Sequence, residues 1–254
     1  MKVTDRKPSA ALREFVLGYK LIESDGGVVN QLLPDTYMAL AFRLRGDVRH
    51  RDSARLSALP ECTVSGLRSS MREIEYGNGA STLVVQLSAV GASHLFREPL
   101  HLFFNQTLAL DDIDQFGARE LHEQVLAAHA LPRQIDVVER FLLDRIKERS
   151  DDPVIREAIR RISESCGLVR MRALSSDLCL SLDAFEKRFR KAVGATPKQY
   201  ASIVRMRAII EKRPADLAQT TYDFEFYDPA HFSKSFKQFT GKTPTDFFTN
   251  PTFW

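Results

Sequence analysis

Apolar and polar positions alternate in short runs along the first 110 residues. The clearest runs, separated by Gly, Pro, Asn or Asp, are residues 27–34, 37–44, 62–67 and 81–87. This alternation predicts half-buried β-strands, and turn residues between several short strands favour a sandwich or a barrel. We therefore expect a β-rich N-terminal domain.

The pattern becomes helical from about residue 114. Two apolar stripes follow with the spacing of one helix face: Phe116, Leu121, Val125 and Leu126 in the first, and Ile135, Val138, Phe141, Leu142 and Ile146 in the second. Two helices joined near Leu131-Pro132 would form an antiparallel pair. Such a pair either packs on the β-rich domain or makes a dimer interface.

The last hundred residues contain one helical pattern twice. Ser181 in the first copy and Asp228 in the second can cap a helix that carries two Phe residues on one face and ends at a Gly. An internal repeat of this kind indicates two similar small modules. The shared positions are Phe185, Phe189, Gly194 and Pro197 in the first copy, and Phe232, Phe236, Gly241 and Pro244 in the second.

These patterns predict an α+β protein with two domains. Residues 1–150 form a β-barrel or sandwich-like domain with the helical pair, and residues 151–254 form an all-α domain with two similar helical units, which the resemblance described next implies are helix-turn-helix units. The charge distribution agrees: residues 153–254 hold 17 Lys and Arg and 11 Asp and Glu, a net charge of +6, whereas the remainder carries −3. Opposite signs are expected when only one part faces phosphate.

The C-terminal segment resembles the DNA-binding domain of AraC/XylS-family transcription regulators. It matches the family's motif in the second unit at Phe226, Asp228, His231, Phe232, Phe236, Lys237 and Pro244. Within the first half, residues 33–36, 65–67 and 83–91 resemble the cupin-like sensor domain of one branch of these regulators. The resemblance implies a sequence-specific transcription regulator, controlled by a small-molecule effector or by dimerisation through its N-terminal domain.

Three positions depart from the family's pattern. The turn that usually holds Gly has Cys179 in the first unit and Glu225 in the second, and Thr221 stands where a small Ala is usual. A non-Gly residue that adopts positive φ in a turn destabilises the fold by about 1 kcal/mol relative to Gly. We therefore expect either reshaped turns or less stable units. Pro214 also ends the connecting helix early.

The resemblance also implies which residues contact DNA. In each unit the second helix enters the major groove, and Lys187 and Lys234, at equivalent positions, can donate to guanine or to phosphate. We expect Arg205 and Arg207 to contact phosphates. The groove-facing residues are Asp183, Glu186, Lys187 and Arg190 in the first unit, and Pro229, Ala230, Ser233, Lys234 and Lys237 in the second.

A ligand pocket is expected between the sheets, lined by residues such as Tyr37, Phe42 and Phe103. The expected partners are promoter DNA, a small-molecule effector, RNA polymerase and a second copy of the chain. The N-terminus has no apolar signal core, and no segment has the roughly 18 apolar residues of a membrane span. We therefore expect a cytoplasmic, nucleoid-associated protein.

Catalytic signatures are missing from the sequence. The six His include no His-x-His pair of the kind that holds metal in cupin enzymes, and no Gly-x-Ser-x-Gly is present. We expect no metal site, no cofactor and no enzyme activity. Cys62, Cys166 and Cys179 are expected to be buried, reduced thiols.

Two alternatives remain open at this stage. One is a cupin-like enzyme or ligand-binding protein with a degenerate helix-turn-helix appendage, which the departures at Thr221 and Glu225 favour. The other is a ligand-independent regulator whose N-terminal half only dimerises.

Overall fold

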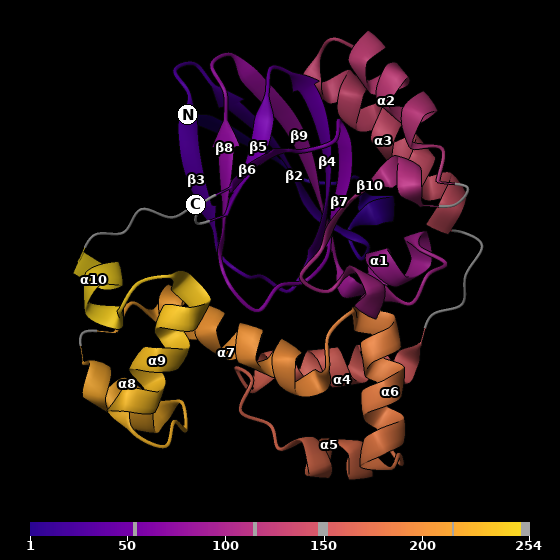
Figure 1. The fold of residues 1–254 in the computed structure, drawn as a ribbon. Helices are drawn as coiled ribbons and strands as arrows, with labels where there is room; N and C mark the ends of the chain where they lie inside the picture. The colour runs from indigo at the N-terminus through magenta and orange to yellow at the C-terminus, as the bar shows by residue number, and fades with distance from the viewer. Residues whose placement is uncertain (53–54, 114–115, 147–151, 215, 250–254) are drawn as a thin grey trace.

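Two antiparallel sheets lie face to face in the N-terminal part of the protein (Figure 1). The computed structural model describes residues 1–52, 55–113, 116–146, 152–214 and 216–249. The six-stranded sheet has the order β1 (Lys2–Arg6), β2 (Val16–Ser24), β9 (Ala80–Leu87), β4 (Met38–Arg45), β7 (Cys62–Ser65) and β10 (Thr107–Ala109). The four-stranded sheet has the order β3 (Val28–Leu32), β8 (Arg72–Tyr76), β5 (Val48–Asp52) and β6 (Arg55–Ala58).

The two faces of the six-stranded sheet have different roles. On β4 the large residues Met38, Leu40 and Phe42 are fully buried in the main core. The small residues between them, Ala39 and Ala41, line a cavity between the two sheets. Because successive side chains on a strand point to opposite faces, one strand builds both the core and the cavity wall.

Helices cover the outer face of the six-stranded sheet: α1 (Ala89–Leu95), α2 (Ala118–Ala127) and α3 (Leu131–Ile146) (Figure 1). The second predicted stripe is largely confirmed, since Ile135, Val138, Leu142 and Ile146 are buried on α3. The helix α2 packs against β4, β7 and α3. Of the two alternatives for this pair, packing on the sheet is therefore observed. Short 3-10 helices lie in the connections: η1 (Ala10–Leu12), η2 (Leu100–Phe103) and η3 (Leu110–Asp112).

Two helical units joined by a long helix make up the C-terminal part (Figure 1). The first unit contains α4 (Pro153–Glu164), α5 (Met171–Asp177) and α6 (Leu182–Val193). The second contains α8 (Leu217–Asp223), α9 (Pro229–Thr240) and α10 (Pro244–Thr249), and α7 (Pro197–Lys212) runs between the units. The expected early end of the connecting helix is observed, because Arg213 caps α7 in a left-handed conformation just before Pro214.

Both units dock onto the N-terminal part at equivalent positions. Gly194 ends α6 with φ of 95°, and a Cβ there would lie 3.1 Å from the carbonyl oxygen of Leu100. Gly241 ends α9 with φ of 80°, and a Cβ there would lie 2.8 Å from Cε of Met71. Buried side chains of both parts form one continuous cluster. The expected domain boundary at residues 150 and 151 lies outside the described residues.

One expectation about the cysteines is wrong. Cys62 is buried, but Cys166 and Cys179 are exposed. Both exposed residues have positive φ, 51° and 56°, in the turns that follow helices. Such turns lie at the surface, so a thiol there faces solvent.

Candidate nucleic-acid interface

The helix α6 begins and ends as its sequence predicts. The hydroxyl of Ser181 accepts a hydrogen bond from the backbone N–H of Ala184, and Gly194 is the left-handed C-cap. Phe185 and Phe189 are fully buried with their rings 5.6 Å apart, and Phe189 also contacts Tyr200 on α7. This aromatic seam fixes the inner face, so the opposite face of α6 is left to solvent.

The helix α9 repeats this construction. The carboxylate of Asp228 accepts a hydrogen bond from the backbone N–H of His231 at 2.6 Å, and Pro229 occupies the first turn. Phe232 and Phe236 are buried, and Phe226 packs 5.1 Å from Phe232. A Pro in the first turn and a Gly after the last turn define the helix at both ends.

The two turns keep their left-handed geometry without Gly. Cys179 has φ of 56° and Glu225 has φ of 51°. In both turns the next residue donates a backbone hydrogen bond back into the preceding helix, Leu180 to Ser175 and Phe226 to Thr221, each at 2.9 Å. This is the pattern of a Schellman cap. The turns are therefore not reshaped, and the strain of a side chain at positive φ remains in both.

Thr221 is accommodated inside the second unit. Its side chain is fully buried, and its hydroxyl donates to the carbonyl oxygen of Leu217 at 3.0 Å. A buried hydroxyl with a partner costs little free energy, whereas one without a partner would destabilise the unit. The hydroxyl that Thr221 adds relative to Ala therefore has its hydrogen-bond partner within the same helix.

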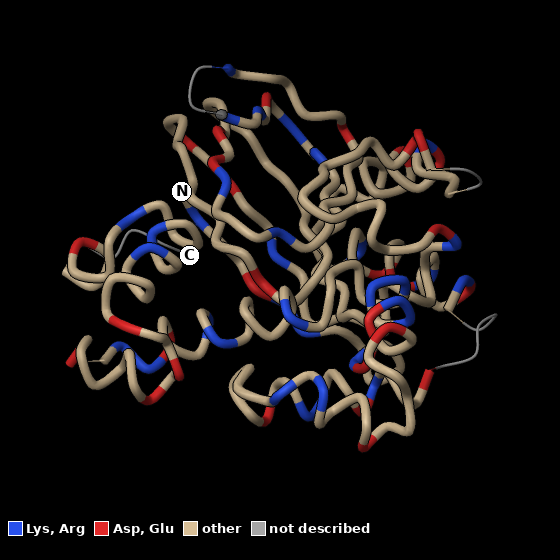
Figure 2. The backbone as a smooth tube through the Cα atoms, turned by 60° about the horizontal axis from the view of Figure 1, so that its bottom comes forward, with Lys and Arg blue, Asp and Glu red and all other residues tan. Residues whose placement is uncertain are grey.

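Four predicted DNA-contacting cations are exposed on the two helices: Lys187 and Arg190 on α6, and Lys234 and Lys237 on α9. In the described part of the chain none of these four makes an ion pair with a carboxylate. Neighbouring Arg188, in contrast, is held by both oxygens of Asp152 at 2.7 and 2.9 Å. Figure 2 shows the positions of all described Lys and Arg residues in blue and of Asp and Glu residues in red along the backbone.

The other predicted groove-facing residues are also at the surface. Asp183 and Glu186 on α6 are exposed, as are Pro229 and Ala230 at the start of α9, whereas Ser233 is half-buried. The two helices point their C-terminal ends at the N-terminal part. Their opposite, N-terminal ends are those from which a recognition helix contacts bases.

Arg205 and Arg207 are engaged inside the protein. The guanidinium of Arg205 lies 4.5 Å from the centroid of the Phe226 ring, and burial lowers its pKa. Arg207 makes an ion pair with Asp35 of the N-terminal part at 2.9 Å. Both side chains are only partly accessible because α7 runs between the two units beneath the sheets (Figure 1), a placement that the sequence did not indicate.

A groove runs beside α6. It is lined by Asp183, Glu186, Lys187, Arg190 and Lys191 on the helix side, with Thr196, and by Pro99 and His101 from the N-terminal part. Burial and the nearby Arg190 lower the pKa of His101. The N-terminal part therefore lies directly beside the predicted DNA-contacting face of the first unit.

Two exposed aromatic residues were missed by the sequence reasoning. Tyr227 is 91% exposed and Tyr222 is 71% exposed, both next to the turn that precedes α9. Tyrosine hydroxyls contact phosphates in many protein–DNA complexes. The sequence could have indicated them, because Tyr222 and Tyr227 lie at polar positions, outside the apolar positions of the Phe residues that form the core of this unit.

The expected pocket lies between the sheets, but two of its three predicted residues lie elsewhere. Tyr37 lines the cavity, whereas Phe42 and Phe103 are buried in the core. Phe42 lies on the outer face of β4, and Phe103 ends η2 beneath the neighbouring Phe96 ring. Residues 37 and 42 are an odd number apart, so a strand that holds both turns them to opposite faces.

Two domain families match the chain. Residues 174–250 match a helix-turn-helix domain, and residues 4–109 match a domain of unknown function called DUF6597. The Msm operon regulatory protein of Streptococcus mutans is 24% identical over 150 residues, which are 57% of this chain and 54% of that protein. The chain thus matches about half the length of this curated relative.

The solved structures that align with this chain include those of two proteins. ToxT from Vibrio cholerae gives a TM-score of 0.48 at 12% identity over 98% of each chain. The AraC-like transcriptional activator CuxR gives a TM-score of 0.28 at 14% identity, covering 83% of this chain and 86% of that one.

The sheets and helices of the chain and its helix-turn-helix match together define the class: a protein with an antiparallel β-rich domain followed by a double helix-turn-helix domain. The C-terminal region carries the helix-turn-helix domain of the AraC type, as its motif predicted. No helix in the described part of the chain has the length and apolar character needed to cross a bilayer.

Proposed function

We propose that the chain is a sequence-specific transcription regulator that binds promoter DNA through α6 and α9. The observation that carries this proposal is the pair of exposed cations on each helix that make no ion pair with any described carboxylate, with Lys187 and Lys234 at equivalent positions of the repeat. A cation that no carboxylate neutralises is available to phosphate or to the acceptor edge of guanine. Arg188 and Asp152 illustrate the contrary case, in which the charge is already satisfied.

The proposed DNA contacts are Asp183, Glu186, Lys187 and Arg190 on α6, and Pro229, Ala230, Ser233, Lys234 and Lys237 on α9. We add Tyr222 and Tyr227 as phosphate contacts. Arg205 and Arg207 keep a different role in this proposal, because their internal partners hold α7 against the second unit and against the N-terminal part.

The N-terminal part is proposed to hold the effector. Asp35 lines the cavity and pairs with Arg207 on α7, and the neighbouring Thr36 hydrogen-bonds Tyr200 on the same helix. A ligand that moves residues 35 and 36 therefore acts on the helix that sets the spacing of α6 and α9. RNA polymerase and a second copy of the chain are further partners in this proposal, and the site of action is the bacterial nucleoid in the cytoplasm.

The alternative of a degenerate helix-turn-helix is less well supported. Both turns keep their left-handed residue, both recognition helices keep their caps, and both aromatic seams are buried. A ligand-independent dimerisation module is also less well supported, because it has no use for a cavity between the sheets. We assign no catalytic step to the chain.

The test is a fluorescence-anisotropy titration of the full chain against the DNA upstream of its own gene. A shuffled duplex of the same length and composition is the control. We expect binding to the upstream DNA to be at least about 10³-fold tighter, as is usual for specific over non-specific binding. Equal affinity for the two duplexes would remove sequence-specific regulation as the function.

A further inference from the structure

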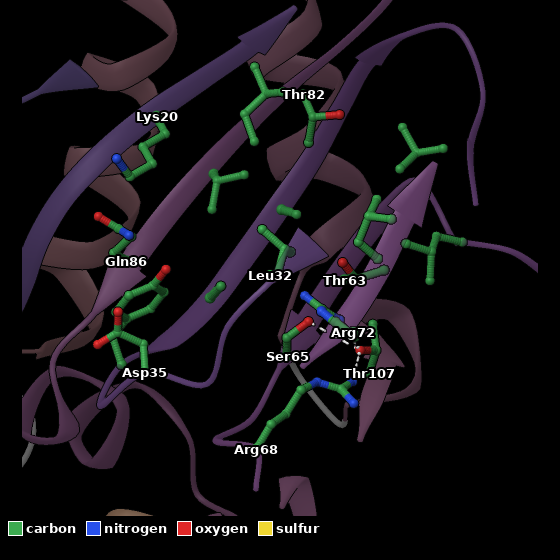
Figure 3. A pocket seen from close by; sticks show the side chains of 18 of the residues that line it. Lys20, Leu32, Asp35, Thr63, Ser65, Arg68, Arg72, Thr82, Gln86 and Thr107 are labelled. Atoms are coloured by element: carbon green, nitrogen blue, oxygen red, sulfur yellow. Dashed lines mark hydrogen bonds between the residues drawn. The ribbon is translucent and has the colours of Figure 1, made fainter. Parts of the chain in front are cut away.

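The cavity between the sheets has two guanidinium groups at one end. Arg72 comes from β8, and Arg68 comes from the loop that precedes it. Both donate to the same hydroxyl oxygen of Thr107, at 2.6 Å from Nη1 of Arg72 and 2.5 Å from Nη2 of Arg68. Figure 3 shows the two side chains converging on Thr107, with Ser65 beside them.

This cluster lacks a negative partner. In the described part of the chain, no carboxylate forms an ion pair with Arg68 or Arg72. The Nε of Arg68 is buried without a hydrogen-bond partner. Each guanidinium has five N–H donors, and the shared Thr107 hydroxyl, with the Asn105 carbonyl oxygen that Nη1 of Arg68 also reaches at 3.3 Å, cannot satisfy all of them. Burial and the mutual repulsion of the two groups lower the pKa of Arg68 to about 10.

The other charged groups of the cavity wall are already compensated. Asp35 is paired with Arg207 at 2.9 Å, and Lys20 is paired with Asp5 at 2.6 Å. Within the described residues, two positive charges without a carboxylate partner therefore remain at one end of the cavity. Burying a charge is unfavourable unless it is paired, so this end of the cavity is suited to an oxyanion. Guanidinium groups match carboxylate and phosphate oxygens with two parallel hydrogen bonds.

The rest of the wall is mainly apolar. The cavity has a volume of about 120 Å³, and both sheets contribute aliphatic side chains to it: Ile22, Leu32, Val48, Leu59, Ile74 and Val84. Ala39 and Ala41 leave the space that larger residues would fill. A ligand of this cavity therefore needs an apolar body as well as an anionic end.

We propose that the cavity binds a small organic oxyanion, with its carboxylate or phosphate group on Arg68, Arg72, Ser65 and Thr107 and its apolar body between the sheets. The proposal gives the chemical class of the effector and in that respect rests on the proposed function. The binding itself needs no DNA, so it is tested separately from DNA recognition.

The experiment measures the melting temperature of the full chain with probes that share one body. The probes are 3-phenylpropionate, 3-phenylpropyl phosphate and the neutral 3-phenylpropan-1-ol, each at millimolar concentration, and the set is repeated with octanoate, octyl phosphate and octan-1-ol. We expect at least one anion to raise the melting temperature in a saturable way while its matched alcohol does not. The carboxylate and phosphate arms show which oxyanion is preferred.

Two variants distinguish anion binding at this site from a non-specific stabilisation of the chain by anions. Arg72→Met should lose the anion-dependent shift, and without a probe it should melt at the wild-type temperature or above it, because a cation without an acidic partner is removed. Arg45→Met, at an exposed arginine of β4, should keep the full shift. The proposal is overturned if no anion shifts the wild type, if the alcohols shift it equally, or if Arg72→Met responds like the wild type.

Discussion

At the scale of single residues, four caps determine where α6 and α9 begin and end. Ser181 and Asp228 each accept a backbone hydrogen bond in the first turn, and Gly194 and Gly241 close the helices in a left-handed conformation. The chemistry of these four residues made their roles predictable from the sequence. The direction of Phe42 was predicted wrongly, since an aromatic residue in a strand is compatible with either face and Phe42 points into the core instead of the cavity. The burial of Arg205 was also missed, because its partner Phe226 is distant in sequence and nothing local indicates the contact.

The strained turn gives the first residue-level prediction. Cys179→Gly should raise the free energy of unfolding by about 1 kcal/mol, because Gly adopts positive φ without the Cβ clash. Cys179→Ala is the matched control and should bring no such gain, since it keeps the Cβ. Chemical denaturation of the three proteins measures the difference. Equal stability of the Gly and Ala variants would show that the turn is unstrained.

The buried aromatic residues of α9 give the second residue-level prediction. Phe232→Ala should lower the free energy of unfolding by about 3–5 kcal/mol, because it opens a cavity in the small core of the second unit. Tyr227→Ala, which removes an exposed ring from the same unit, should change it by less than about 0.5 kcal/mol. Thermal melts followed by circular dichroism compare them. A Phe232→Ala melt like that of the wild type would contradict the packing of α9.

At the scale of elements, alternation located β3, β4, β7 and β9, whereas β1, β2, β5, β6, β8 and β10 were not among the predicted runs. Residues 37–44 and 81–87 correspond closely to β4 and β9. The strand β8 was missed because Arg72 stands at an inward position and disturbs the alternation of Arg72-Glu-Ile-Glu-Tyr76. Local rules are often broken at functional sites, and here the irregular strand carries a residue of the proposed ligand site.

The recognition helix of the second unit gives a prediction at this scale. Lys234→Ala should weaken binding to the upstream DNA and reduce the slope of log affinity against log salt by about 1, the change expected for one lost phosphate contact. Lys7→Ala, at an exposed lysine of the N-terminal part, is the control and should leave the slope unchanged. A wild-type slope for Lys234→Ala would remove this residue from the interface.

At the scale of the whole molecule, the arrangement of the two parts could not be predicted. The pairs that join them, Asp35 with Arg207 and Leu100 with Gly194, are far apart in sequence and belong to no periodic pattern. The ion pair with Asp35 explains why Arg207, which was expected to contact phosphate, lies at the junction of the two parts. They also connect the cavity wall to the helix between the two DNA-binding units.

The junction gives a prediction that distinguishes the two roles of Arg207. Arg207→Ala should leave the salt slope of DNA binding unchanged, because its guanidinium is held by Asp35 rather than by phosphate. It should lower the free energy of unfolding by no more than about 1 kcal/mol, since the pair is partly exposed to solvent. Asp35→Asn should have a similar effect on stability. A slope reduced by about 1 in Arg207→Ala would return this arginine to the DNA interface.

Two equivalent helices of one chain are proposed to bind DNA together. The most direct measurement is the salt dependence of affinity for the upstream DNA, compared between the wild type, Lys187→Ala, Lys234→Ala and the double variant. We expect each single substitution to lower the slope by about 1 and the double variant to lower it by about 2. A double variant with the slope of either single variant would mean that only one helix contacts the DNA, against the proposed binding by both.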